Sequence, residues 1–254
     1  MFSEGDIIGL AAVYIYVAIV VVIAAKWKLI RNAKLHRKFV HIMVGNIVFL
    51  WWVFDSSYVM AFLAAAPFIP LLLLASPYSH FSKLKDSFLG RTAGESHDLG
   101  LVYYAISWTI LAFFFFDYRL IASIAIVAMA YGDGLGGLIG KRYGKHKLRG
   151  PKTLEGTVAV FVGTLVATFI VIQFYQWLNF HDLIAIPEVS LPASIVVALL
   201  IGTFVAVVEL LTPGAYDNLV IPLGTAVLLL LLAYFYDDWN TTINTVSSIL
   251  MLGR

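Results

Sequence analysis

Long runs of apolar residues limit the fold of this chain more than any other feature of its sequence. Eight stretches are candidates to cross a membrane as helices: residues 7–25, 39–54, 58–75, 99–116, 120–140, 156–178, 193–211 and 219–236. A helix that crosses the hydrocarbon core needs roughly 20 apolar residues. Hydrophobic residues make up 61% of the chain and charged residues 13%, which is more apolar surface than a soluble core of this size can bury. The sequence therefore predicts an all-α fold, a polytopic membrane bundle of about eight transmembrane helices in a single domain, residues 1–254.

The ends and short connections of this bundle can also be predicted. The first six residues, MFSEGD, are acidic and lack the basic segment of a cleavable signal peptide, so we expect the first stretch to be a retained helix. Only residues 54–57 separate the second and third stretches, which favours a tight helical hairpin. The tail over residues 238–254 has apolar residues near helical spacing, and we expect it to lie along the membrane interface.

Basic residues are gathered in three of the connections. Of the 17 Lys and Arg residues, residues 26–38 hold six, residues 76–98 hold three and residues 141–152 hold six. With eight spans and the N-terminus outside, all three connections fall on the same side of the membrane. The positive-inside rule identifies that side as the cytoplasm.

The residues that can carry chemistry are concentrated on the same cationic side. The chain has no cysteine, which excludes disulfides, thiolate metal sites and a cysteine nucleophile. Asp133 lies near the end of an otherwise apolar stretch, where an acid is energetically costly and therefore a functional candidate. Glycines surround Asp133, and a dense Lys/Arg/Gly segment follows over residues 140–152. An acid able to hold Mg²⁺, flexible glycine backbone and several cations suit a bound polyphosphate.

The glycines around Asp133 also allow a structural interpretation. Gly132, Gly136 and Gly140 recur every four residues, and on a helix they would form a smooth face for close packing. Two familiar phosphate-binding motifs do not apply here. Gly140-Lys141 is followed by Arg142 instead of the Ser or Thr of a Walker A loop. The G-x-G-x-x-G match over residues 132–137 ends a membrane helix instead of opening the helix of a βαβ unit.

Further polar residues are expected at the same depth, near the cytoplasmic ends of four other stretches: Arg37, Lys38, His41, Glu95, Tyr104, Glu209, Asp217 and Asn218. Lys38 and His41 are three residues apart and so share one face of a helix. The turn before the last stretch carries acids and no cation. Its acids are either ion-pair partners of the basic connections or a metal and base site, and we favour the second interpretation.

Taken in chain order, these groups resemble a known family. They are Arg37-Lys38-x-x-His41, Gly100-x-x-Tyr103-Tyr104, Gly132-Asp133-Gly134 through Gly140-Lys141-Arg142-Tyr143-Gly144, Pro151-Lys152-Thr153-Leu154-Glu155-Gly156-Thr157, and Glu209 with Asp217-Asn218-Leu219-x-x-Pro222. The ordered set resembles the polyprenol kinase family, which includes dolichol, phytol and farnesol kinases and the CTP-dependent diacylglycerol kinase. In length the chain is nearest to the phytol kinase branch.

The resemblance implies a membrane kinase that transfers the γ-phosphate of CTP, or of another nucleoside triphosphate, to a lipid alcohol such as geranylgeraniol, phytol or dolichol. It implies that Asp133 and the glycines after it form the nucleotide and metal segment and that Lys141, Arg142 and Lys152 contact phosphate. Together with the reasoning from the residues, the candidate catalytic residues are Asp133, Lys152, Glu209 and Asp217, with either Glu209 or Asp217 as the base that takes the hydroxyl proton. The candidate nucleotide-binding residues are Lys38, Gly136, Gly137, Gly140, Lys141, Arg142, Lys152, Thr153 and Asn218. Arg37, His41, Glu95 and Tyr104 are expected to contact the substrate or to be structural polar residues. Mg²⁺ on Asp133 and Glu209 is the expected cofactor.

Two other functions stay open at this point. A CTP-dependent cytidylyltransferase that makes a CDP-lipid needs the same metal, cations and membrane placement. A transporter is disfavoured, because the charges gather at one face instead of the membrane midplane. The expected partners are membrane lipids, a lipid alcohol and a nucleotide, with no nucleic acid. Aromatic residues such as Trp51 and Phe113 could flank a lipid tail, but we interpret them as lipid-facing surface.

The predicted orientation can be tested by labelling single cysteines, because the chain has none of its own. We expect residues 26–38, 76–98, 141–152 and 212–218 to face the cytoplasm. A membrane-impermeant maleimide should therefore label Lys147→Cys only after the cells are permeabilised, and should label Asp182→Cys in intact cells. Labelling of Lys147→Cys from outside would contradict the topology.

Overall fold

The computed structural model describes residues 2–26, 33–81, 83, 90 and 99–251, with the side chains of all of these except residues 33–35 and 236–251. Its elements are α1 (Glu4–Lys26), α2 (Ala33–Gly45), η1 (Asn46–Phe49), η2 (Trp51–Val53), η3 (Val59–Ala65), α3 (Phe68–Ala75), α6 (Gly100–Phe114), η4 (Phe116–Tyr118), α7 (Arg119–Tyr143), β1 (Lys147–Arg149), β2 (Lys152–Thr153), α8 (Leu154–Phe180), α9 (Leu191–Leu211), η5 (Gly214–Tyr216) and α10 (Asp217–Met251). The segment η3 is a π-helix, and the other η segments are 3₁₀-helices. The described chain is almost entirely helical, which confirms the predicted all-α fold.

Helix length and composition fit a membrane protein. Among the described residues, five helical segments are long and apolar enough to cross a membrane: Glu4–Lys26, Phe116–Tyr143, Leu154–Phe180, Leu191–Leu211 and Gly214–Phe235. The other three predicted stretches form shorter or interrupted helices, namely α2 with η1 and η2, η3 with α3, and α6. The count of eight spans and the external N-terminus stay predictions.

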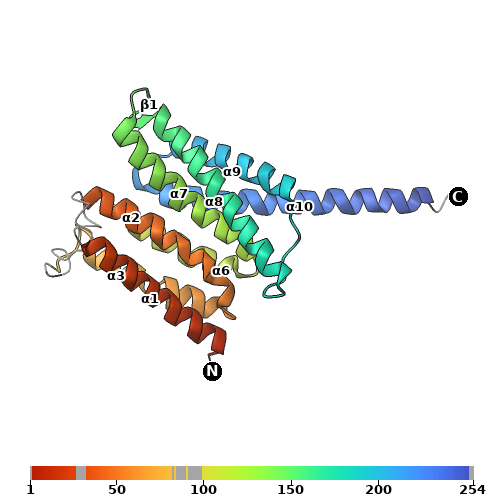
Figure 1. Cartoon of the computed structure of the whole chain (residues 1–254), viewed down its shortest axis with the longest axis horizontal. Helices are drawn as coiled ribbons and strands as arrows, with labels where there is room; N and C mark the ends of the chain where they lie inside the picture. Colours follow the sequence, from red (N-terminus) through yellow and green to blue (C-terminus); the bar gives the residue numbers. More distant parts are fainter. Residues whose placement is uncertain (1, 27–32, 82, 84–89, 91–98, 252–254) are drawn as a thin grey trace.

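The helices fall into two groups that α2 and α6 connect (Figure 1). One group contains α1, α2, α3 and α6, and the other contains α7, α8, α9 and α10. Helix α2 packs against both α1 and α7, and α6 packs against both η3 and α10. Helix α7 is the most enclosed of the long helices. In its most apolar 18-residue segment 72% of the residues are buried, compared with 22% in that of α1. The tail that was expected at the membrane interface continues α10 without a break to Met251.

The second and third stretches are joined by a short turn, as predicted, but in the described residues they pack against α1 and other helices instead of forming a tight hairpin with each other. Residues 54–56 connect η2 to the helical segment that contains η3. Asp6 of α1 is buried, and its Oδ1 accepts hydrogen bonds from the backbone N–H groups of Asp55 and Ser56, each at 3.1 Å. These bonds satisfy backbone donors that would otherwise be unpaired in the turn. Asp6 therefore fixes this turn against the start of α1.

Glycines allow α7 and α8 to pack closely, as the spacing of Gly132, Gly136 and Gly140 predicts. A Cβ atom at Gly140 would lie 3.2 Å from the Cα atom of Gly156 on α8, and one at Gly136 would collide with Val160. Small residues are needed where helix backbones approach this closely. The structural interpretation of these glycines is confirmed.

The basic connection after α7 forms a small hairpin that the sequence did not predict. Strands β1 and β2 pair antiparallel, and Gly150 between them has a φ of 54°, a left-handed conformation that suits glycine. Glu155 in the first turn of α8 accepts hydrogen bonds from the backbone N–H groups of Lys145 and His146 and contacts His146 Nδ1 at 2.7 Å. The hairpin is therefore held by an acid that follows it in the chain.

The contact between α2 and α7 can be tested with a matched pair of substitutions. A Cβ atom at Gly45 would overlap that of Ala130 on α7, whereas at Gly224 the nearest atom is 3.5 Å away on the Phe204 ring. Both Gly→Ala changes raise helix propensity by up to about 1 kcal/mol. We expect Gly45→Ala to lower the free energy of unfolding by about 1–3 kcal/mol through overpacking, and Gly224→Ala to leave it unchanged or raise it. Thermal unfolding in detergent measures both, and equal effects would contradict the close contact.

Candidate functional site

Asp133 lies at the centre of a group of polar side chains in the interior of the bundle. It projects from α7, and its carboxylate Oδ2 is 2.6 Å from Lys38 Nζ on α2. Lys38 Nζ also donates to the backbone carbonyl of Asp133 at 3.1 Å. A Cβ atom at Gly137 would lie 2.9 Å from Lys38 Cε, so the lysine crosses to Asp133 over a position with no side chain. The predicted shared face of Lys38 and His41 is directed at Asp133.

His41 completes this side of the group. Its Nε2 atom is 3.6 Å from Asp133 Oδ2, and its side chain is only 4% exposed. Tyr104 of α6 donates a hydrogen bond to the His41 carbonyl at 3.0 Å, and the two rings are 4.3 Å apart. Tyr104 is therefore a structural polar residue that holds His41. In the described part of the chain, no hydrogen bond engages His41 Nε2.

A second lysine–carboxylate pair forms at the start of α8. Lys152 of β2 forms an ion pair with Glu209 of α9, and Glu209 is 6% exposed. Position and burial agree with the prediction that Glu209 is a polar residue inside an apolar run. The ion-pair interpretation of this acid, which we set aside at first, describes its contact in the structure. Arg149 of the same hairpin donates to the Leu211 carbonyl at 3.3 Å, which ties the hairpin to the end of α9.

Asp217 and Asn218 begin α10 beside these two pairs. Both are buried, and Asp217 Oδ1 accepts hydrogen bonds from the backbone N–H and the side-chain amide of Asn218, each at 2.8 Å. The charges of Asp133, Lys38 and Lys152 all act on the Asp217 carboxylate, and that of Lys152 acts on Asp133. The two pairs and Asp217 therefore form one cluster, which we call the acid–lysine cluster: Lys38, His41, Asp133, Lys152, Glu209, Asp217 and Asn218.

The remaining predicted residues lie around this cluster or outside the described part of the chain. Lys141 and Arg142 are exposed on the last turn of α7, just over two helical turns beyond Asp133. Thr153 caps α8 by accepting a hydrogen bond from the Gly156 N–H. Arg37 precedes Lys38 on α2 and is partly buried. Glu95 lies outside the described residues.

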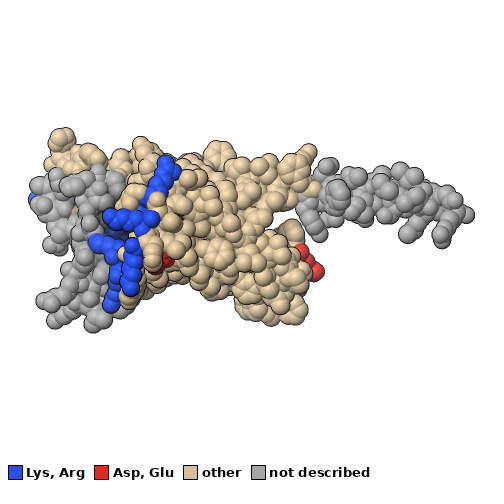
Figure 2. All heavy atoms as spheres, turned by 90° about the horizontal axis from the view of Figure 1, so that it is seen from above, with Lys and Arg blue, Asp and Glu red and all other residues tan. Residues whose placement is uncertain are grey.

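On the face shown in Figure 2, the Lys and Arg side chains gather at one end of the bundle, with acidic side chains beside them and at the opposite end. They come from the start of α2, the end of α7 and the hairpin β1–β2, which the fold brings together. Each lysine of the acid–lysine cluster is partly buried and faces a carboxylate, so the charges of Asp133 and Glu209 are each balanced as burial requires. Such an arrangement can bind an anionic group and can exchange protons with it.

The oxygen atoms of the acid–lysine cluster suit Mg²⁺, which binds through one or two carboxylates, water and substrate phosphates. Asp133, Asp217 and Glu209 supply carboxylates, and Asn218 Oδ1 is a buried oxygen that no donor in the described residues engages. The described residues contain no group of three or more His, Asp or Glu side chains placed to hold a metal by themselves. The donor set therefore fits an ion that takes most of its ligands from phosphate and water.

An apolar cavity of about 420 Å³ adjoins the cluster and was missed by sequence reasoning. It lies between α1, α2, η3–α3 and α6, and both His41 and Tyr104 line it. Trp51, which we interpreted as lipid-facing, lines the same cavity and is 1% exposed, so that interpretation is wrong for this residue. Its lining comes from residues far apart in the sequence, and no local pattern marks them.

Known proteins resemble the chain over most of its length. It is 26% identical to the phytol kinase of Synechocystis sp., over 87% of this chain and 89% of that protein. It is also 26% identical to phytol kinase 1, chloroplastic, of Arabidopsis thaliana (75% of this chain, 64% of that protein) and 28% identical to farnesol kinase, chloroplastic, of the same plant (58% and 48%). No family model and no solved structure matches the chain.

The ion pair between Lys38 and Asp133 can be tested through stability. Lys38→Met leaves the Asp133 carboxylate buried without its lysine, and we expect a loss of up to about 3–5 kcal/mol in the free energy of unfolding. The double variant Lys38→Met/Asp133→Asn removes both charges and should recover most of that loss. Unfolding in detergent with Lys147→Met as the exposed control measures the coupling. Additive effects of the two substitutions would contradict the pair.

Proposed function

Because the chain belongs to the polyprenol kinase family, near its phytol kinase branch, we propose that it transfers the γ-phosphate of CTP, or of another nucleoside triphosphate, to the hydroxyl of a prenol. The acceptors we favour have the size of phytol, farnesol or geranylgeraniol. We further propose that the active site faces the cytoplasm, where a soluble nucleotide is available. The names of the relatives support the kinase class, and the donor nucleotide is our inference.

The observation that carries this proposal is the position of the acid–lysine cluster between a basic surface and an apolar cavity. On one side are the exposed cations of α7 and of the hairpin β1–β2, and on the other is the cavity lined by His41 and Tyr104. A nucleoside triphosphate is anionic and a prenol is apolar, so the two substrates must meet where such surfaces adjoin. Phosphoryl transfer is mainly positioning and neutralisation of charge on the transferring oxygens.

The reaction follows from these groups. The prenol oxygen forms a bond to the γ-phosphorus, and the bond between that phosphorus and the bridging oxygen of the β-phosphate breaks. The hydroxyl proton passes to a carboxylate of the acid–lysine cluster. Asp217 is suited to accept it, since among the described residues no lysine or arginine forms an ion pair with it. The products are a prenyl monophosphate and a nucleoside diphosphate.

Charge on the phosphates is neutralised by Lys38 and Lys152 from within the cluster and by Lys141 and Arg142 from the surface. Lys152 lies two residues before α8, so its ammonium adds to the N–H groups and the dipole of that helix end. Bound Mg²⁺ would be held by Asp133 and Glu209, with Asp217 and Asn218 beside them, and would supply further neutralisation of phosphate charge.

Substitution of Lys152 distinguishes two roles for the basic residues, contact with phosphate during catalysis and orientation of the protein in the membrane. We expect Lys152→Ala to lower transfer of label from γ-³²P-CTP to geranylgeraniol by about 10²- to 10³-fold, as for the loss of one transition-state contact. Lys147→Ala, at an exposed position on the same hairpin, should retain nearly full activity. Equal and mild effects would favour the topological role. Incorporation of α-label instead of γ-label would identify a cytidylyltransferase.

A second variant controls for stability, because Lys152→Ala leaves the buried Glu209 carboxylate unpaired. Lys152→Met/Glu209→Gln replaces the pair by neutral side chains of similar size. We expect this double variant to unfold near the wild-type temperature and to be inactive. A double variant that is both stable and active would exclude Lys152 from catalysis.

A further inference from the structure

The apolar cavity beside the acid–lysine cluster has one polar end. Almost all of its lining is apolar, and the exceptions on α2 and α6 are His41, Tyr104 and Trp108, whose ring packs against Tyr104 with centroids 6.3 Å apart. Its volume of about 420 Å³ lies within the roughly 300–1,000 Å³ of small-molecule sites. An enclosed apolar space with a single polar end matches the chemistry of a long-chain alcohol.

The polar end carries a side chain with unused hydrogen-bonding capacity. His41 is 4% exposed and lines the cavity, and among the described residues nothing hydrogen-bonds its Nε2 atom. That atom is 3.6 Å from Asp133 Oδ2. A hydroxyl placed here can bond to His41 Nε2 and lie beside Asp133. Buried polar atoms are normally paired, so an unpaired one on a residue that lines a cavity is a candidate to bind the polar group of a ligand.

The cavity also reaches toward the lipid between α1 and α3. Tyr14 and Leu71 line it and are 43% and 38% exposed, so its wall there is formed by side chains that are not enclosed by the bundle. The Tyr14 hydroxyl donates to the Leu63 carbonyl at 2.6 Å, and its ring stacks on Phe68 at 5.9 Å. Leu63 belongs to η3, and π-helical segments are frequent at functional sites. Tyr14 therefore bridges α1 and η3–α3 in the wall of the cavity.

We propose that this cavity binds the hydrocarbon tail of the acceptor prenol, with the hydroxyl at His41 and Asp133 and entry from the membrane past Tyr14. This inference rests on the proposed kinase function and adds where the acceptor binds and how long its tail is. His41 is a positioning residue in this arrangement, since it orients the hydroxyl toward the cluster.

The length of the cavity selects the length of the prenol. His41 and Trp51 both line the cavity and are ten residues apart along α2, η1 and η2. A rise of about 1.5 Å per α-helical residue and about 2 Å per 3₁₀ residue separates them by about 18 Å. An extended chain covers about 1.2 Å per main-chain bond, so this distance accommodates about 15 main-chain carbons. Each isoprenoid unit adds four of these, and the cavity therefore fits a tail of three to four units, as in farnesol and geranylgeraniol. Longer tails extend back past Tyr14.

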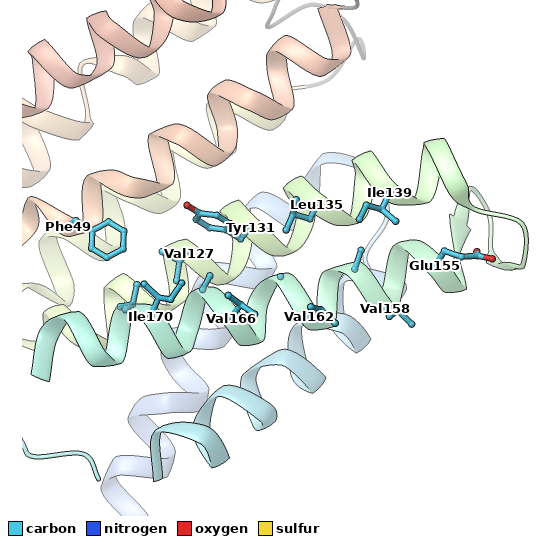
Figure 3. Close-up of a pocket in the computed structure, with 14 residues that line it drawn as sticks. Phe49, Val127, Tyr131, Leu135, Ile139, Glu155, Val158, Val162, Val166 and Ile170 are labelled. Atoms are coloured by element: carbon cyan, nitrogen blue, oxygen red, sulfur yellow. The ribbon is translucent and has the colours of Figure 1, made fainter. Parts of the chain in front are cut away.

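A second apolar pocket is the alternative site for the tail, and a substitution in it provides the control for the experiment. A groove of about 510 Å³ runs between α7 and α8, lined by Val127 and Leu135 on one helix and by Val162 and Val166 on the other (Figure 3). Glu155, at one end of this groove, is already engaged by His146 and the Lys145 N–H. Tyr131, which also lines the groove, donates its hydroxyl to Asn46 Oδ1 at 2.6 Å. Both polar side chains of the groove are therefore already hydrogen-bonded, although its volume is larger.

The test measures activity against a series of alcohols. Ala64 of η3 lines the cavity, and Ala64→Phe shortens the space for the tail. A buried methylene contributes about fourfold to binding. We therefore expect kcat/KM for farnesol and geranylgeraniol to fall by more than about tenfold in Ala64→Phe, while that for geraniol changes little. Val166→Phe, at a half-exposed position in the groove of Figure 3, should leave the whole profile unchanged.

A binding measurement separates this inference from the proposed function. A farnesol analogue with a diazirine at its tail end should label peptides that contain Val13–Ala18 or Ala64–Leu72, and excess farnesol should prevent labelling. Labelling there without phosphorylation of any alcohol would overturn the kinase proposal and retain the tail site. A chain-length profile that shifts with Val166→Phe, or labelling confined to Val158–Ile170, would overturn the tail site even in an active kinase. An unchanged profile in Ala64→Phe would overturn it as well.

Discussion

The rest of the structure depends on how one carboxylate is kept inside a membrane helix. Asp133 is 8% exposed in the most enclosed long helix of the bundle, where an unpaired charge would be very unfavourable. Lys38 neutralises it from α2, which requires α2 to lie against α7 and Gly137 to leave room for the lysine. Because α2 also packs against α1, this ion pair fixes how the two groups of helices meet.

The need to pair buried carboxylates with lysines also explains why the charged residues of the site lie at one end of the bundle. Lys152 comes from a hairpin that Glu155 and Arg149 hold against α8 and α9, and Asp217 begins the helix that follows. The start of α2, the hairpin β1–β2 and the start of α10 therefore bring charged side chains to the same level of the bundle. A soluble polyphosphate can reach that depth from water, and the hydroxyl of a lipid can reach it from the adjoining cavity. In the proposed reaction, neither substrate would have to leave the phase in which it is stable.

Several features of the site could be predicted before the structure was known. Asp133, Glu209, Lys38 and Lys152 were all recognisable, because a charged residue within or beside an apolar stretch is costly and is kept for a reason. The partners of these residues were not predictable, since Lys38 and Asp133 are 95 residues apart and Lys152 and Glu209 are 57 apart. The hairpin β1–β2 was missed because its strands are held by a later acid and show no apolar alternation.

The sequence by itself determined the all-α membrane class, the position of each apolar stretch and the gathering of cations in three connections, because these follow from hydropathy and charge along the chain. Only the tertiary structure decided which acid meets which lysine and that an apolar cavity ends at His41. Pairing and cavities depend on contacts between helices far apart in sequence, and no local periodicity encodes them. Trp51 shows the difference, since an aromatic residue in an apolar stretch suits lipid and interior equally well. Its surroundings are decided by α6, where Trp108 packs against it with ring centroids 4.8 Å apart.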